Sequence, residues 1–256
     1  MEYYPEQKRI FLSKIVEKIK NDESTSADSK IHELLQLDNA NVDFLAIDVP
    51  SQLPLCLECQ LRCPGYENCT ESHIEWMWQH YESLNVKKRP RRFFTPYTQR
   101  CVEMHLATEL EESFLLPHLL GSNSAPLVAR ARFILRRSQR PVIEVNPKLS
   151  VWRIGRSLGI RPSQLRFHRH SVGGDESRRL ILNTLGEHNI AFLYEQDRKL
   201  MIENNHAFES FICAMTGFLR TKGYTEKRPS HFPEKESWIE FPVAKIPWAK
   251  ILNKNV

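Results

Sequence analysis

Three acidic residues occur within or directly after apolar stretches of the sequence, where a carboxylate could do chemistry. Asp48 ends the short apolar run 44–47 (FLAI), and Pro50 follows in a turn. A run of this length bounded by turn residues predicts a strand buried on both faces. Open α/β sheets bind ligands at the carboxyl ends of their strands, so Asp48 is a candidate catalytic acid. The alternative is that Asp48 only organises the turn, because Asp bonds readily to its own backbone.

Two more acids follow the same logic. Glu144 lies in the apolar segment 142–145 (VIEV), a second predicted strand that ends before Pro147. Glu209 falls inside the apolar stripe of the helix predicted over 203–223. A carboxylate there is costly unless it is paired or bound to metal, so Glu209 is either the partner of an arginine or part of a site. Acids converging from separate segments suit a divalent cation or general acid–base chemistry.

Arg100 and Glu103 form a further candidate pair. They stand three residues apart at the start of a helix predicted within 95–110, where side chains at this spacing are neighbours. Such a pair is either an ordinary helix salt bridge of little energetic weight or, beside a catalytic carboxylate, a group that orients a phosphate or a metal-bound water.

Four cysteines lie close together, with two, three and five residues between them: Cys56, Cys59, Cys63 and Cys69. Four thiolates can close a tetrahedral shell around zinc, and a site without an open position is structural. The spacing differs from the usual two-knuckle ribbon and from the bacterial ferredoxin run, although an iron–sulfur cluster and disulfides stay open as alternatives. His73 and His80, on the helix predicted over 71–84, are more often surface or core histidines than ligands.

Two basic stretches could contact nucleic acid. One begins at Lys87 and ends at Arg92, and Phe93 and Phe94 follow it; the other begins at Arg130 and ends at Arg140. Basic residues beside aromatic ones can hold phosphates and stack bases. The alternatives are a solvated linker and a solvated helix face, the latter formed by Arg132, Arg136 and Arg140 at a spacing of four.

Composition places the chain among ordinary globular proteins. It has 256 residues, of which 41% are hydrophobic and 26% charged, with a formal net charge of +5 that permits a nucleic-acid partner without requiring one. No apolar run is long enough for a membrane span, and the first residues lack the pattern of an export signal. We therefore expect a cytoplasmic protein, whose cysteines hold metal more often than they pair.

Apolar periodicity predicts a mixed α/β protein. Helices are predicted over 6–20, 29–37, 71–84, 121–137, 149–158 and 203–223, with a further helix start after the Gly-Gly pair at 173–174. Strands are predicted over 42–48, 142–145 and 237–243. We expect one domain over 1–256, with residues 54–70 inserted as a zinc loop.

Several motifs, in order, carry a resemblance to a known family: VDFLAIDVPSQLP, TPYTQRCVEMHL, PVIEVNPKLSVWRIGRSLGI, HAFESFICAMTGFL and SWIEFP. From about residue 42 to 243 the chain resembles the domain-of-unknown-function 429 family, whose members are predicted nucleases with a ribonuclease H-like fold. The cysteine loop is similar to that of a bacterial subgroup.

The resemblance implies a mixed sheet flanked by helices, with acids gathered to hold Mg²⁺ or Mn²⁺ for phosphodiester hydrolysis. It assigns the site to Asp48, Glu144, Glu209, Arg100 and Glu103, with Glu209 where the family usually has Asp. Ribonuclease H-like sites normally begin with an Asp on a first strand. Here that strand is expected to be missing or truncated, with Met1 an uncertain start, so cleavage is expected to be weak or absent.

Three functions from different classes follow. The first is a metal-dependent nuclease acting through Asp48, Glu144 and Glu209. The second is a zinc-stabilised module that binds nucleic acid without cutting it. The third is a structural or partner-binding protein.

Overall fold

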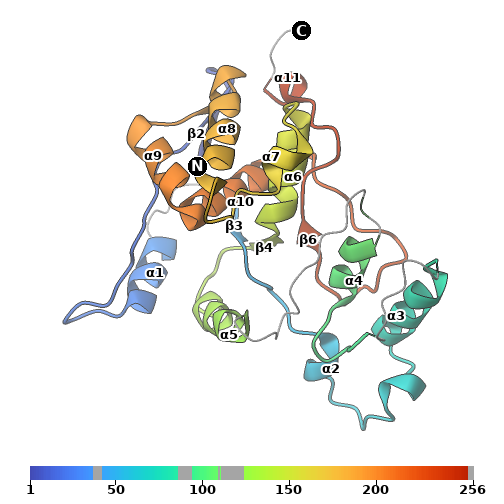
Figure 1. Ribbon diagram of the computed structural model, residues 1–256. Coiled ribbons are helices and arrows are strands. Elements are labelled where there is room, and N and C mark those ends of the chain that lie inside the picture. The colour runs from blue at the N-terminus through green and yellow to red at the C-terminus, as the bar shows by residue number, and fades with distance from the viewer. Residues whose placement is uncertain (37–41, 86–93, 109, 111–123, 253–256) are drawn as a thin grey trace. The chain divides into compact units, whose positions relative to one another are not determined.

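The computed structural model describes residues 1–36, 42–85, 94–108, 110 and 124–252, and it divides the chain into two compact units (Figure 1). Unit 1 comprises Met1–Asp48, Ser138–Glu226 and Glu240–Val256; unit 2 comprises Val49–Arg137 and Lys227–Ile239. Residues 54–70, the expected loop insertion, lie in unit 2. The described part of the chain is a mixed α/β protein with two small three-stranded sheets. None of its helices combines the length and apolar composition needed to cross a bilayer.

The first sheet lies in unit 1. Its strands are β1 (Glu2–Tyr4), β2 (Arg9–Phe11) and β5 (Ala191–Phe192), in that order. β1 pairs antiparallel with β2, and β2 pairs parallel with β5, so that Ile10 lies opposite Ala191. Ile10 is fully buried.

The helix predicted over 6–20 is therefore wrong. Residues 9–11 form β2, and residues 12–22 contain no regular helix or strand. β-Branched and aromatic residues such as Ile10 and Phe11 favour a strand wherever a partner strand is present, and β5 supplies one from far along the chain. Neither β1 nor β2 contains an Asp, the residue that the resemblance expects on a first strand.

The second sheet has the order β3-β4-β6 and contains the two predicted acid-bearing segments. β3 (Leu45–Ile47) and β4 (Val142–Val145) are parallel, with Ile47 opposite Glu144; β6 is Ile239–Glu240. The three strand predictions are confirmed in place, although β3 and β6 are shorter. The residues of β3 are partly exposed rather than buried on both faces. Parallel pairing brings the carboxyl ends of β3 and β4 to the same edge.

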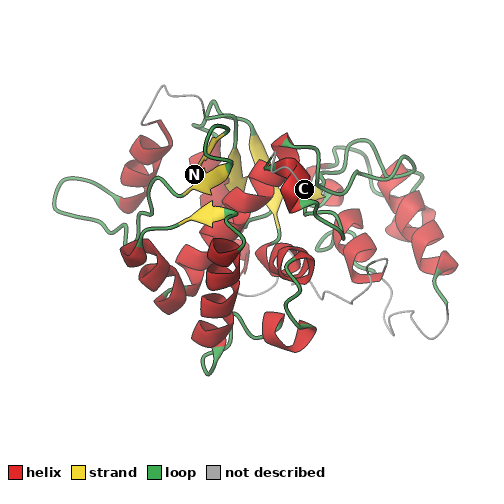
Figure 2. Cartoon of the chain, turned by 90° about the horizontal axis from the view of Figure 1, so that it is seen from above, coloured by secondary structure: helices red, strands yellow, loops and turns green. Residues whose placement is uncertain are grey.

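Helix α10 (Asn205–Thr221) is the longest element of unit 1 and packs against β3, β4, α6 and α9. The side chain of Asn204 caps its start by accepting hydrogen bonds from the N–H groups of His206 and Ala207. Gly217 permits close packing on β3, because a Cβ there would lie 2.5 Å from Phe44. Figures 1 and 2 show helices flanking the strands of unit 1.

The remaining helices of unit 1 include confirmed and unpredicted elements. Three match predictions: α1 (Ala27–Gln36), α6 (Pro147–Ser157) and α8 (Gly174–Glu187). Three short ones were not predicted: α7 (Pro162–Leu165), α9 (Glu195–Glu203) and α11 (Trp248–Ile251). The core of this unit is built from side chains of β2, α6, α8, α9 and α10, among them Ile10, Leu149, Ile154, Ile181, Met201, Phe208 and Ile212.

Unit 2 is mainly helical. It contains α2 (Leu55–Glu58), the 3-10 helix η1 (Tyr66–Asn68), α3 (Ser72–Ser83), α4 (Cys101–Thr108) and α5 (Ser124–Leu135). Aromatic rings fill much of its interior; Trp78 lies edge-to-face with Phe94 at 4.7 Å, and Trp76 with Phe232 at 5.1 Å. Because α5 ends at Leu135, Arg136 and Arg140 lie outside it, and the predicted helical face of three arginines is wrong.

Candidate active site

Glu209 is buried in unit 1 and is held by three side chains. Its Oε1 atom accepts from Nε of Arg169 and lies 3.4 Å from Nε2 of His168, and its Oε2 atom accepts from Nδ2 of Asn205 at 3.0 Å. Burial acts to raise the pKa of Glu209, but the hydrogen bonds from His168 and Arg169 and the charge of Arg169 together lower it. The sequence left two roles open for Glu209, the partner of an arginine or part of a site. The structure shows that Arg169 is its arginine partner.

Arg169 extends this network to Asp48. Its Nη2 atom lies 3.5 Å from Oδ2 of Asp48, while its Nε atom contacts Glu209. One guanidinium thus joins the acid after β3 to the acid in α10. The side chains of Arg169 and Asp48 are 46% and 43% exposed, so solvent and ligands reach both groups.

Asp48 is the acid of the site whose pKa moves toward neutrality. Its pKa is raised to about 7: burial by neighbouring atoms is the main cause, Arg169 opposes it, and the charges of Glu209 and Glu144 add smaller increases. Because the side chain is nearly half exposed, water screens part of this effect. A carboxyl group with a pKa near the working pH can serve as a general base or acid.

Glu144 stands beside this pair on a different face of the sheet. Its neighbours Ile143 and Val145 pack with Cys213 of α10, and successive strand residues face opposite sides. The side chain of Glu144 therefore leaves the strand on the face of the sheet opposite α10. Its charge nevertheless raises the pKa of Asp48. We call Asp48, Glu144 and Glu209 the acid cluster; Asp48 and Glu209 share Arg169, and Glu144 flanks them.

A divalent cation matches the acid cluster in chemistry but not in arrangement. The carboxylates are hard oxygen ligands, and Oδ1 of Asn205 is buried without a hydrogen-bond partner beside Glu209. Yet no three His, Cys, Asp or Glu side chains within the described residues are grouped so as to hold a metal ion. Arg169 already pairs with both Asp48 and Glu209, so a cation has to compete with it.

Arg100 and Glu103 lie in unit 2, where they form a buried cluster of their own. Arg100 is 1% exposed; its Nε atom donates to Oε1 of Glu103 at 3.0 Å and its Nη1 atom to Oγ of Ser237 at 3.1 Å. Glu236 accepts from the backbone N–H of Cys101 at 2.9 Å at the start of α4, and burial raises its pKa to about 7. The pair belongs to a network that caps α4.

The four cysteines of the thiol loop, Cys56, Cys59, Cys63 and Cys69, are free thiols in unit 2. The pKa of Cys56 is raised to about 11, chiefly by burial and to a smaller extent by the charges of Cys69, Cys59 and Cys63. His73 is buried, and its Nε2 atom lies 3.5 Å from Sγ of Cys56. These side chains are soft donors of the kind that zinc prefers, although within the described part of the chain they too are not grouped tightly enough to hold an ion.

The other sequence-predicted features have no role in the acid cluster. His80 stacks on Trp76 and bonds to Thr108 at 2.8 Å. The basic stretch from Lys87 to Arg92 lies outside the described residues. In the stretch from Arg130 to Arg140, Arg132 pairs with Glu58 at 3.0 Å, while Arg130 and Arg136 are exposed.

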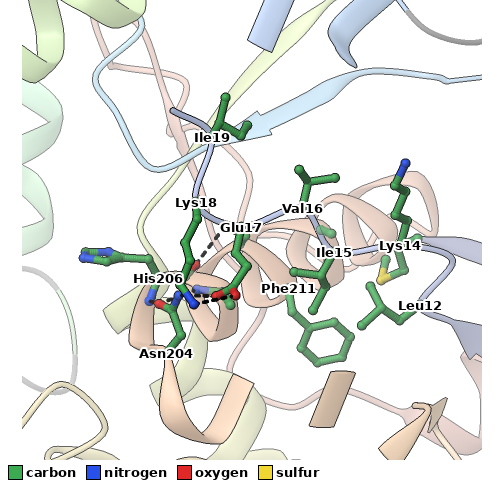
Figure 3. Close-up of a pocket in the computed structure, with 14 residues that line it drawn as sticks. Leu12, Lys14, Ile15, Val16, Glu17, Lys18, Ile19, Asn204, His206 and Phe211 are labelled. Atoms are coloured by element: carbon green, nitrogen blue, oxygen red, sulfur yellow. Dashed lines mark hydrogen bonds and ion pairs between the residues drawn. The ribbon is translucent and has the colours of Figure 1, made fainter. Parts of the chain in front are cut away.

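A cavity of about 440 Å³ lies elsewhere in unit 1, between residues 12–19 and α10 (Figure 3). Its polar groups pair with one another: Glu17 lies 3.0 Å from Lys18 and accepts from Asn204 at 3.4 Å. The α10 residues that line it include Ala207, Phe211 and Ala214, whereas Glu209 is not among them. This cavity is separate from the acid cluster.

Sequence reasoning missed Arg169, His168 and Asn205. The segment 166–170 (RFHRH) is rich in groups that bind carboxylates, and Asn205 stands four residues before Glu209 in the same helix. The spacing of Asn205 and Glu209 could have been read from the sequence, whereas only the tertiary structure brings residues 168–169 to Glu209. Comparison of the chain with protein-family models, with curated proteins and with solved structures found no match.

Proposed function

We propose that this chain is a metal-dependent nuclease of ribonuclease H-like topology that hydrolyses phosphodiester bonds at the acid cluster. The observation that carries the proposal is the exposed arginine between Asp48 and Glu209. It puts a phosphate-binding group next to a carboxyl group whose pKa lies near neutrality. The parallel pair β3–β4 with α10 on one face, and the resemblance to the domain-of-unknown-function 429 family, support the same function.

The residues have separate tasks in this proposal. Arg169 has five N–H donors, more than its contacts with Asp48 and Glu209 use, so it can bind a phosphate oxygen as well. Asp48 accepts the proton of the water that attacks phosphorus while the bond to the leaving oxygen breaks. Glu209 positions Arg169 and His168, since both of its oxygens are already engaged.

A divalent cation, Mg²⁺ or Mn²⁺, would have to displace Arg169 before Asp48 with Glu144 or Glu209 could hold it, and it would then supply stabilisation of negative charge on the phosphate. Arg100 and Glu103, which the resemblance also assigns to the site, belong to unit 2, and their buried network supports a structural task there.

The test is degradation of labelled single-stranded and double-stranded DNA and RNA with added Mg²⁺ or Mn²⁺. Wild type is expected to cleave weakly, with a rate that is half-maximal near pH 7 and levels off above about pH 8, and Asp48→Asn is expected to abolish cleavage. Asp43→Asn, which removes an exposed carboxylate near the start of β3, is the matched control. Salt-sensitive binding without cleavage would instead point to the non-catalytic binding module.

We also propose that the thiol loop holds a structural zinc ion. Its short helices have little core of their own, and bound zinc supplies folding free energy on the order of 10 kcal/mol in such loops. The purified protein is expected to contain about one equivalent of zinc. Binding to the apo-protein is expected to release protons, because the Cys56 thiol has a raised pKa and must ionise. Less than half an equivalent of zinc, without iron, contradicts this part.

A further inference from the structure

A second pocket of unit 1, of about 520 Å³, is built from α7, the loop to α8 and the first turns of α8. We call it the loop pocket; its lining includes Ser163, Gln164, Phe167, His170, Val172 and Glu176. This volume is in the range of small-ligand sites. The wall combines two aromatic rings with an amide and a carboxylate, a composition suited to a flat heterocycle with polar edges.

One turn connects the loop pocket to the acid cluster. The N–H of His170 donates to the carbonyl of Phe167 at 2.8 Å and closes the four-residue turn 167–170. The outer residues of the turn, Phe167 and His170, line the pocket, whereas the inner residues, His168 and Arg169, contact Glu209. The ends of such a turn lie within about 7 Å of each other, so the pocket and the cluster are adjacent.

Hydrogen bonds to neighbouring groups hold the turn 167–170 in place. Buried Arg178 donates to the carbonyl of His168 and, through Nε at 2.8 Å, to the carbonyl of Ile202. The ring of His168 lies 3.2 Å from the carbonyl of Leu165. The N–H of Val172 bonds to Nδ1 of His170 at 3.2 Å and fixes that ring. The aromatic wall of the pocket is therefore organised before any ligand arrives.

We infer that the loop pocket binds a nucleobase of a single-stranded nucleic acid whose phosphate lies at Arg169. The side chains of Phe167 and Val172 are 52% and 78% exposed, an apolar surface that a stacked base would cover. The Phe167 and His170 rings lie edge-to-face, with centroids 6.0 Å apart. Aromatic faces stack on any base, and Gln164 and Glu176 offer partners for its edge.

Charge favours a nucleic acid over an apolar peptide as the occupant. The segment 161–179 carries five arginines against two acids, Asp175 and Glu176. A net positive segment next to exposed aromatic rings is the combination found in grooves that bind single strands. This inference rests on the proposed nuclease function and deepens it, because it names single-stranded nucleic acid as the substrate and residues 163–176 as the base subsite.

The test is fluorescence anisotropy at low salt, without added Mg²⁺ or Mn²⁺, using a labelled 12-nucleotide DNA strand and an identical strand with abasic positions. Wild type is expected to prefer the strand with bases. Phe167→Ala is expected to weaken binding of that strand roughly 5- to 150-fold and to leave the abasic strand within about twofold. Phe167→Trp retains the preference, and Tyr194→Ala, which removes an exposed ring outside the pocket, changes neither affinity.

Equal affinity of wild type for both strands, equal loss on both in Phe167→Ala, or no binding at all would overturn the inference. The same proteins separate it from the nuclease proposal. Base preference without metal-dependent cleavage leaves the loop pocket standing and removes the nuclease. Cleavage that depends on Asp48, without base preference, supports the nuclease proposal and removes the loop pocket as a base subsite.

Discussion

Asp48→Asn offers the sharpest test of the acid cluster, because it predicts a gain of stability from removing a candidate catalytic group. The folded protein raises the pKa of Asp48 to about 7, chiefly through burial, whereas the unfolded chain leaves it near its ordinary value. The folded state therefore binds the proton more tightly. As far as this group is concerned, stability falls as pH rises from about 4 to about 7 and is constant above that range.

The magnitude follows from the two pKa values and the exposure of the side chain. A rise in pKa from about 4 to about 7 would be worth about 4 kcal/mol without screening. The Asp48 side chain is 43% exposed, so we expect solvent to reduce this to about 1–2 kcal/mol. Asparagine does not ionise, and Asp48→Asn should be more stable than wild type by that amount at pH 8 and equally stable below pH 4.

Urea unfolding from pH 4 to pH 8, followed by fluorescence and circular dichroism, measures this difference. Asp43→Asn is the control, since Asp43 is an exposed carboxylate two residues before β3, which begins at Leu45. This control should follow wild type across the whole pH range. A constant difference between Asp48→Asn and wild type over that range, or a less stable Asp48→Asn at pH 8, would refute the reasoning.

Other predictions test the network and the packing around the acid cluster. Arg169→Gln should destabilise the protein by about 2–3 kcal/mol in urea unfolding, because buried Glu209 keeps His168 and Asn205 but loses its cationic partner. The same variant should bind Mn²⁺ more tightly in calorimetry, and weaker binding would count against competition between the metal and Arg169. Gly155→Ala should cost about 1–3 kcal/mol, because its Cβ would lie 2.2 Å from Leu165, whereas Gly186→Ala, with open space around it, should stabilise α8 by about 0.5–1 kcal/mol.

The predictions from sequence succeeded where a segment's own pattern decides its structure. The apolar run before Asp48 and the segment around Glu144 are strands, and the stripe around Glu209 is a helix. The prediction failed for residues 6–20, whose apolar residues fit a helical stripe equally well. Residues 9–11 form a strand there because β5, about 180 residues further along the chain, pairs with β2.

The residues of the candidate site likewise divide into those that the local sequence pattern predicts and those that only tertiary contacts reveal. Sequence alone identified Asp48 and Glu144 from their places at the end of and within predicted strands, and Glu209 as a carboxylate that is costly within an apolar helical stripe. Only the tertiary structure decided which partners they have: Arg169 and His168 reach Glu209 from a turn 40 residues earlier, and Arg100 and Glu103 belong to another unit. Pairing of charges depends on distance in space, and a single sequence does not record that distance.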